Sequence, residues 1–164
     1  MNQPPLHRRR WLQLCAAASL APHASAFAQA SAKDTERPLV VALPETEAQV
    51  AAVLRTCHAL GVPVVARGAG TGLSGGAMPH AMGVTLSLAK FNKILDVNPL
   101  SRTARVQCGV RNLAISEAAA PHGLYYAPDP SSQIACTIGG NVAENSGGVH
   151  CLKYGLTVHN ILKV

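Results

Sequence analysis

The sequence is poor in aromatic and charged residues, and these shortages exclude several classes of protein. Phe, Trp and Tyr make up 4% of its 164 residues, and charged residues make up 13%. Surfaces that bind nucleic acid combine basic patches with aromatic side chains, and the globular part of the chain shows no such combination. The five cysteines include no C-x-x-C pair, and the seven histidines do not cluster at the spacing of metal ligands. We therefore predict neither a nucleic-acid partner nor a metal site.

Residues 1–33 have the composition of a targeting leader. The formal net charge is +6, yet this segment holds four basic side chains and no acid, while the rest of the chain carries only +2. The arginines Arg8-Arg9-Arg10 precede an apolar run, Trp11–Ala21, and then small residues that offer A-x-A cleavage sites. This start is similar to a twin-arginine export signal, with Trp11 where Phe is usual. Export, a mitochondrial transit peptide and an uncleaved start are the three interpretations that remain.

The cysteines of the globular part carry little functional information. Free cysteine usually behaves as a small buried apolar residue, and this is the expectation for the four that follow the leader. If the leader exports the protein, a disulfide becomes possible, and the sequence does not choose its pairing. The four residues are Cys57, Cys108, Cys136 and Cys151.

The most informative stretch is rich in glycine and follows a short apolar run. Residues 64–77 read VVARGAGTGLSGGA, with five glycines between positions 68 and 76. Such glycines cost backbone entropy, so a packed protein keeps them where φ must be positive or where the backbone must approach something closely. Successive bare N–H groups beside the hydroxyls of Thr71 and Ser74 favour a cradle for an anion, most often phosphate. The alternative is an ordinary flexible loop.

Two familiar phosphate-binding folds do not fit this loop. Residues 70–75 read GTGLSG and match G-x-G-x-x-G, but a Rossmann fold needs a helix to begin at the glycines. Pro79 and Gly83 interrupt any such helix, and the next strand-like run, Val84–Leu88, follows too soon for a helical crossover. A P-loop is excluded because no Lys-Ser or Lys-Thr pair follows the last glycine. We predict a free-standing phosphate cradle.

Before the loop, the pattern predicts a strand, a helix and a second strand. Leu39–Leu43 is a continuous apolar run, as in a buried parallel strand. Thr46 and Gln49 are spaced as a capping box, and Gly61 is a suitable residue to follow the helix end. Val62–Ala66 is the second strand, which completes a βαβ unit with the glycine loop at its carboxyl end. One face of the helix gathers Val50, Val53, Leu54, Cys57 and Leu60.

After the loop, the sequence predicts a further strand, a hairpin and a short helix, followed by a stretch with little periodicity. Val84–Leu88 is predicted to join the same small sheet, and Ile94–Val97 with Thr103–Cys108 to form an antiparallel hairpin. A short helix is expected over Asn112–Ala120. The stretch 127–155 has little periodicity, which is typical of a long loop shaped by function. The last residues, Ile161-Leu162-Lys163-Val164, read as the start of a further strand.

Three motifs carry a resemblance to a known family. RGAGTGLSGGA, YYAPDPSS and CTIGGNVAENSGGVHCLKYG, in this order and at this spacing, resemble the PCMH-type FAD-binding domain of vanillyl-alcohol-oxidase-like flavoproteins. Within that family the motifs are most similar to the FAD-linked oxidases of glycolate and related 2-hydroxy acids. The resemblance runs from Arg37 to Val164. It implies an α+β domain with an α/β start, in which a small parallel βαβ part and a mainly antiparallel second part hold FAD between them.

The resemblance also assigns residues to the cofactor. Arg67 supplies positive charge near the pyrophosphate. The residues that would wrap the pyrophosphate are Gly68, Ala69, Gly70, Thr71, Gly72, Ser74 and Gly75. Those that would line the flavin and its ribityl chain are Pro128, Asp129, Ser132, Thr137, Gly139, Gly140, Asn141, Asn145 and Gly147.

Two further expectations concern the surroundings of the flavin. Several relatives bind flavin covalently through a His in the first glycine loop, where this chain has Thr71, so non-covalent FAD is expected. His150 and Cys151 are candidates for the flavin's surroundings, with a purely structural role as the alternative. The sequence names no catalytic residue.

Two functional hypotheses follow. In the first, the chain is the N-terminal part of an FAD-linked 2-hydroxy-acid oxidoreductase, with glycolate as substrate and D-lactate as the alternative. In the second, it is a non-catalytic FAD-binding fragment, because the family's cap domain, which supplies substrate-binding residues, has no counterpart in these 164 residues. The family resemblance further implies an iron-sulfur electron-transfer partner and a cytoplasmic or peripheral inner-membrane location, whereas the leader indicates export.

Overall fold

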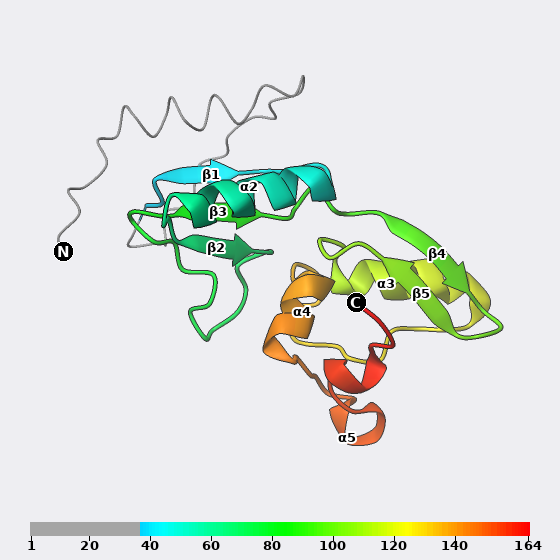
Figure 1. The fold of residues 1–164 in the computed structure, drawn as a ribbon. Coiled ribbons are helices and arrows are strands. Elements are labelled where there is room, and N and C mark those ends of the chain that lie inside the picture. The colour runs from blue at the N-terminus through cyan, green and yellow to red at the C-terminus, as the bar shows by residue number, and fades with distance from the viewer. Residues whose placement is uncertain (1–36) are drawn as a thin grey trace.

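The computed structural model describes residues 37–164; the predicted leader, residues 1–33, lies outside the described residues. Figure 1 shows two parts joined side by side, a parallel sheet with one helix and a hairpin with several short helices. Among the described residues, no helix is long and apolar enough to cross a membrane.

The first part is a three-stranded parallel sheet. Its strands are β1 (Val40–Ala42), β2 (Val64–Arg67) and β3 (Val84–Ser87), in the order β1-β3-β2. The register places Val84 opposite both Val40 and Val64, so β3 is the central strand. Residues Val84 to Leu86 of β3 are accordingly fully buried. The prediction that this run joins the sheet is confirmed.

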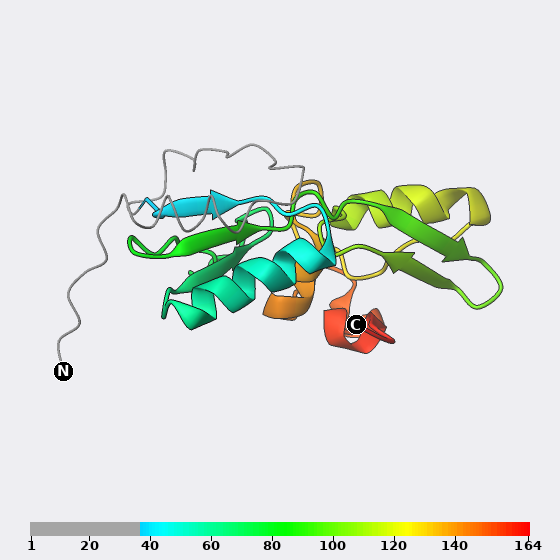
Figure 2. The same cartoon turned by 45° about the horizontal axis from the view of Figure 1, so that its top comes forward.

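Helix α2 (Glu47–Ala59) covers one face of this sheet, as Figure 2 shows. Its start is fixed locally: the Thr46 hydroxyl accepts from the Gln49 amide, and the Gln49 side chain accepts from the Thr46 amide. Gly61 has a φ of +63°, as expected of the residue that follows a helix end. Cys57 packs with Val84 in the core, but Leu54 is 45% exposed. Leu54, which helical spacing groups with these apolar residues, is therefore not part of the core.

The second part is built on an antiparallel hairpin, β4 (Ile94–Asn98) and β5 (Thr103–Val106), as predicted. Helix α3 (Asn112–Ala119) packs beside the hairpin and runs into the 3-10 turn η1 (Ala120–His122). The core of this second part contains Val110, Ile115 and Ile138, which pack against one another.

The stretch predicted as a long loop contains two helices. These are α4 (Ile138–Glu144) and α5 (Cys151–Tyr154), followed by the 3-10 turn η2 (Thr157–Asn160). Pairs of glycine are poor helix formers, so residue types alone indicate no helix here. The first amides of α4 donate to the preceding part of the domain, Ile138 to the Val110 carbonyl (2.9 Å) and Gly139 to the Cys108 carbonyl (2.8 Å). Tertiary hydrogen bonds therefore place this helix.

The last four residues form no strand in this structure. Ile161 has extended backbone angles and packs against the core of the second part, but residues 161–164 pair with no other strand among those described. The predicted strand at 161–164 is thus not observed.

Candidate functional site

The glycine loop connects β2 to β3 without a helix, as the sequence predicted. Residues 68–76 are all exposed, and within the described part of the chain no amide of residues 69–76 donates a hydrogen bond. Gly70 and Gly75 have φ values of +72° and +78°, a region that side chains disfavour. The loop therefore presents a run of unpaired N–H donors, which is the requirement for an anion cradle.

Arg67 supplies the positive charge of this loop. Its side chain extends from the end of β2, and its Nη1 donates to the carbonyl of Ala77 at 3.3 Å. The guanidinium also lies against Gly70, where Nη2 is 2.5 Å from the position that a Cβ would take. Arg67 is thus held inside the turn of the loop. An anion bound on the loop amides would have a guanidinium beside it.

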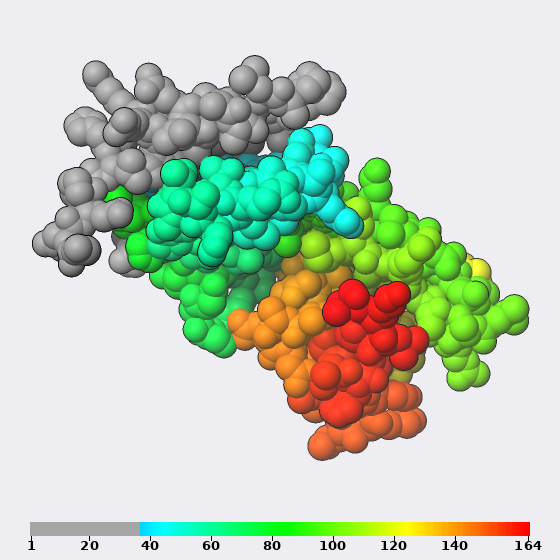
Figure 3. All heavy atoms as spheres, viewed as in Figure 1, coloured from blue at the N-terminus to red at the C-terminus, as the bar shows by residue number. Residues whose placement is uncertain are grey.

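Helix α4 lies along the loop and contacts it at both ends. A Cβ on Gly68 would collide with Oγ1 of Thr137, the residue that precedes the helix. At the other end, Ser74 Oγ donates to Oε2 of Glu144 at 2.8 Å. Figure 3 shows α4, in orange, against the green segment that follows β2. The structure thus brings the two glycine-rich motifs together.

A buried polar network lies behind α4. The Asn112 side-chain amide donates to the carbonyl of Pro128 and to Oδ1 of Asn141, each at 2.9 Å. Asn141 Nδ2 in turn lies 3.3 Å from the Sγ of Cys136. Asn141 is 2% exposed, so its side chain is occupied by this network. Its assignment to the flavin stays a prediction.

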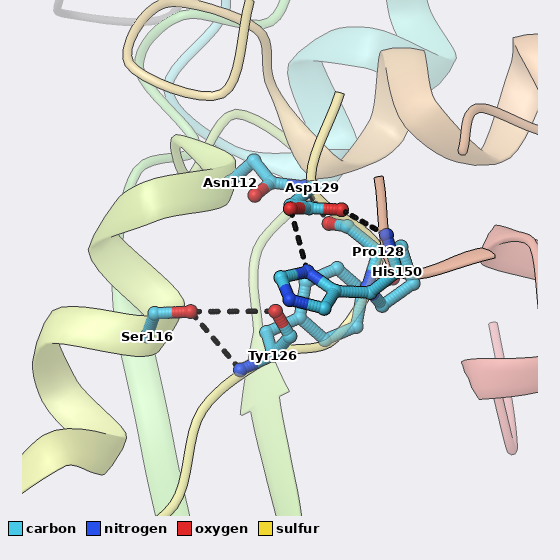
Figure 4. Close-up of polar contacts among 6 residues, drawn as sticks. All are labelled: Asn112, Ser116, Tyr126, Pro128, Asp129 and His150. Carbon is cyan, nitrogen blue, oxygen red and sulfur yellow. Dashed lines mark hydrogen bonds and ion pairs between the residues drawn. The ribbon is translucent and has the colours of Figure 1, made fainter. Parts of the chain in front are cut away.

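Asp129 is paired with His150, as Figure 4 shows. One carboxylate oxygen is 2.7 Å from Nδ1 of the ring, and the other accepts from the His150 amide at 3.2 Å. Burial of Asp129 opposes its ionisation, but these hydrogen bonds and the charge of His150 outweigh burial and lower the pKa of Asp129. His150 thus contacts Asp129, a residue assigned to the flavin, and both alternatives for His150 stay open.

Two tyrosines flank this pair. Tyr125 and Tyr154 meet edge to face, with ring centroids 6.1 Å apart. A hydrogen bond between them raises the pKa of Tyr125 and lowers that of Tyr154, to which Lys153 also contributes. The cluster lies beside the second motif, away from the glycine loop.

The remaining residues assigned to the flavin shape the backbone between Ser132 and Gly147. The Ser132 carbonyl accepts from Ala135 and Cys136 in a tight turn, and Gly139 lets α4 approach Cys108. Asn145 ends α4 with a φ of +50°, and its side chain accepts from the Val158 amide at 3.0 Å. Gly140 and Gly147 are half-buried, and a Cβ on Gly147 would overlap Leu156.

Neither Glu144 nor Asn112 stands out in the sequence as a site residue. Glu144 meets Ser74 across 70 positions of sequence, and Asn112 meets Asn141 across 29. No local spacing signals such pairs. The only hint for Glu144 is that it is an isolated acid in a stretch of glycine and asparagine.

The thiols show no redox pairing. All four cysteines of the described part are free, and no group of His, Cys, Asp or Glu within it could hold a metal ion. Burial raises the pKa of Cys57 and of Cys108. Cys57 and Cys108 are therefore packing residues and not activated nucleophiles.

The cradle fits the diphosphate of a dinucleotide cofactor. Its amides are unpaired and exposed, Arg67 lies within the turn, and at Gly76 a Cβ would meet nothing within 4 Å. Fold and site together define a two-part α+β nucleotide-binding domain. The chain belongs to the FAD binding domain family, whose match covers residues 38–164, and its cofactor is FAD.

Relatives of known name lie within this family. Over 128 residues the chain is 73% identical to glycolate oxidase subunit GlcD of Escherichia coli, which covers 78% of this chain and 26% of that protein. It is 44% identical over 123 residues to D-2-hydroxyglutarate dehydrogenase of Xanthomonas citri, covering 75% of this chain and 26% of the relative. The chain therefore spans about a quarter of the length of these curated relatives.

The fold also matches solved structures of low sequence identity. Alkyldihydroxyacetonephosphate synthase superposes with a TM-score of 0.71 at 22% identity, over 94% of this chain and 35% of the synthase. 6-Hydroxy-D-nicotine oxidase of Arthrobacter nicotinovorans gives 0.67 at 23% identity, over 83% of this chain and 28% of the oxidase. These likenesses establish the fold.

Proposed function

We propose that the chain is the FAD-holding part of an oxidoreductase that acts on 2-hydroxy acids, with glycolate as the first candidate. The observation that carries this proposal is the run of unpaired amides at residues 69–76, packed against α4, in a chain 73% identical to a glycolate oxidase subunit. D-Lactate and D-2-hydroxyglutarate are the alternative substrates.

The residues of this chain bind and orient rather than react. The amides of residues 69–76 donate to the diphosphate, and Arg67 offsets its charge without a lysine. Pro128 and Asp129 begin the segment assigned to the flavin, and the Asn112 network fixes that segment from behind. When bound, FAD supplies the redox chemistry by accepting a hydride from the carbon that bears the substrate hydroxyl.

We further propose that these 164 residues bind FAD but do not oxidise hydroxy acids unaided. The chain covers about a quarter of its relatives, so the groups that recognise substrate are assigned to additional polypeptide. Electrons would then leave to a partner, for which an iron-sulfur subunit is the candidate. Export through the leader of residues 1–33 stays a proposal of the same kind.

The cofactor claim is tested with the purified chain. Titration with FAD should quench flavin fluorescence at a stoichiometry of one, and acid precipitation should release all the flavin, because Thr71 replaces the attaching histidine. A chain that binds no FAD would overturn the proposal, and a yellow acid pellet would overturn the non-covalent mode.

The substrate claim is tested by dye-linked turnover. The FAD-loaded chain should be inactive with glycolate, D-lactate and D-2-hydroxyglutarate. A clone that includes any coding sequence continuing in frame should be most active with glycolate. Activity highest with D-lactate would make that the substrate.

A further inference from the structure

The glycine loop is tied to the second part of the domain by one carboxylate. Glu144, the last residue of α4, accepts from Ser74 Oγ through Oε2 at 2.8 Å. Its other oxygen, Oε1, lies over Gly72, 2.6 Å from the position that a Cβ would occupy. The carboxylate thus contacts two positions of the loop at once, and glycine at 72 is what leaves room for it.

The loop has little else to hold its shape. Its amides make no hydrogen bonds within the described part of the chain, and Leu73 between the two contact points is fully exposed. Two other contacts hold the loop: Thr137 lies against Gly68 at the opposite end of α4, and Arg67 donates to the Ala77 carbonyl and lies against Gly70. Between these anchors, Gly70 turns the backbone with a φ of +72°. The conformation that presents the amides therefore depends on contacts with α4.

We propose that Glu144 is a positioning residue for FAD binding, which holds the glycine loop through Ser74 in the conformation that receives the diphosphate. This inference rests on the proposed function of the loop. It also reassigns Ser74: its hydroxyl donates to Glu144 and is not free to donate to phosphate. A loop already fixed loses less conformational freedom on binding, so the cofactor binds more tightly.

The charge of Glu144 acts in the opposite direction. A carboxylate close to a diphosphate repels it, so Glu144 would weaken FAD binding if it did not also position the loop. Removing the side chain of Glu144 should therefore weaken FAD binding if Glu144 positions the loop, and strengthen FAD binding if it only repels the diphosphate. Glu144→Gln separates acceptor from charge, because the amide oxygen of Gln can still accept from Ser74.

The test is FAD titration of the full chain and its variants. Glu144→Ala and Ser74→Ala should each raise the Kd for FAD by about tenfold, and the double variant should be no weaker than either one. Glu144→Gln should stay within about twofold of the parent. The matched control is Glu117→Ala, which removes an exposed acid from α3 and should change nothing. Glu144→Ala that binds as tightly as the parent, or Glu144→Gln as weak as Glu144→Ala, would overturn the proposal.

A second measurement needs no cofactor. Chymotrypsin should cleave after the exposed Leu73, and should do so several-fold faster in Glu144→Ala and Ser74→Ala than in the parent or in Glu144→Gln. Equal cleavage rates in all four proteins would mean that Glu144 does not hold the loop. If the parent binds no FAD, the proposed function fails, and the cleavage rates still decide whether Glu144 positions the loop.

Discussion

The side-chain amide of Asn112 on α3 donates to Oδ1 of Asn141 on α4 at 2.9 Å, in the interior of the second part. The same nitrogen donates to the Pro128 carbonyl at 2.9 Å. Asn112 is 1% exposed, and its own Oδ1 has no partner among residues 37–164. One residue therefore joins α3, α4 and the segment that begins with Pro128.

Asn112→Ala should destabilise the domain by about 2–4 kcal/mol, because it removes the donor of two buried hydrogen bonds. Urea unfolding of the purified chain, followed by circular dichroism, measures this change. The control is Asn92→Ala at an exposed position, expected within about 0.5 kcal/mol of the parent. Equal unfolding midpoints for Asn112→Ala and the parent would show that the network contributes nothing.

Gly75→Val should weaken FAD binding by at least about tenfold. The φ of +78° is unfavourable for a β-branched residue, and the new side chain would stand among the bare amides. A clash with the rest of the protein would not explain the loss, because a Cβ at position 75 would meet only Met78, at 3.8 Å. Gly61→Val is the matched control, because Gly61 also has a positive φ (+63°) and open space at its Cβ position but follows the end of α2, outside the cradle. Flavin fluorescence titration distinguishes the two, and equal affinity of Gly75→Val and the parent would mean that the cradle is misplaced.

Gly148→Ala should unfold or severely destabilise the second part, by about 3 kcal/mol or more. A Cβ at this position would overlap the backbone carbonyl of Asp129, which cannot rotate away. Gly140→Ala is the comparison: its Cβ would make an ordinary contact of 3.5 Å with Thr137, and alanine favours the helix. Thermal unfolding should therefore rank Gly148→Ala well below the parent and Gly140→Ala at or above it. The reverse order would contradict the packing described here.

Asp129 should stabilise the fold in a pH-dependent way. Its pKa is lowered in the folded state by the hydrogen bonds and charge of His150, which outweigh the effect of burial. Such a group stabilises the fold above its unfolded pKa of about 3.9, and this contribution disappears as the pH falls through the lower folded value. The difference in Tm between the parent and Asp129→Asn should therefore shrink as the pH is lowered from about 5 to 3. Asp96→Asn, at an exposed position of β4, should show no such trend. A constant difference for Asp129→Asn would contradict the pairing.

Much of the fold is encoded locally, in residues that lie a few positions apart. Thr46 and Gln49 mark the start of α2, and the pair Asn98-Pro99 marks the turn between β4 and β5. The glycine loop was located as well, because bare amides and positive φ have a direct signature in residue type. Leu54 shows the limit: helical spacing groups it with the apolar residues of α2, but only the packing of the folded chain decides whether it is covered.

Distant contacts decided the rest. The sequence by itself determined the α+β class and, through the resemblance carried by its three motifs, the FAD-binding family. It also located the glycine loop, residues 68–76, that we propose as the diphosphate site. Only the tertiary structure decided that Gly139 and Gly140 are helical, that Asn141 turns inward to Asn112, and that Ser74 meets Glu144. The physical reason is that hydrogen bonds between distant residues form only once the chain has packed, and no local propensity records them.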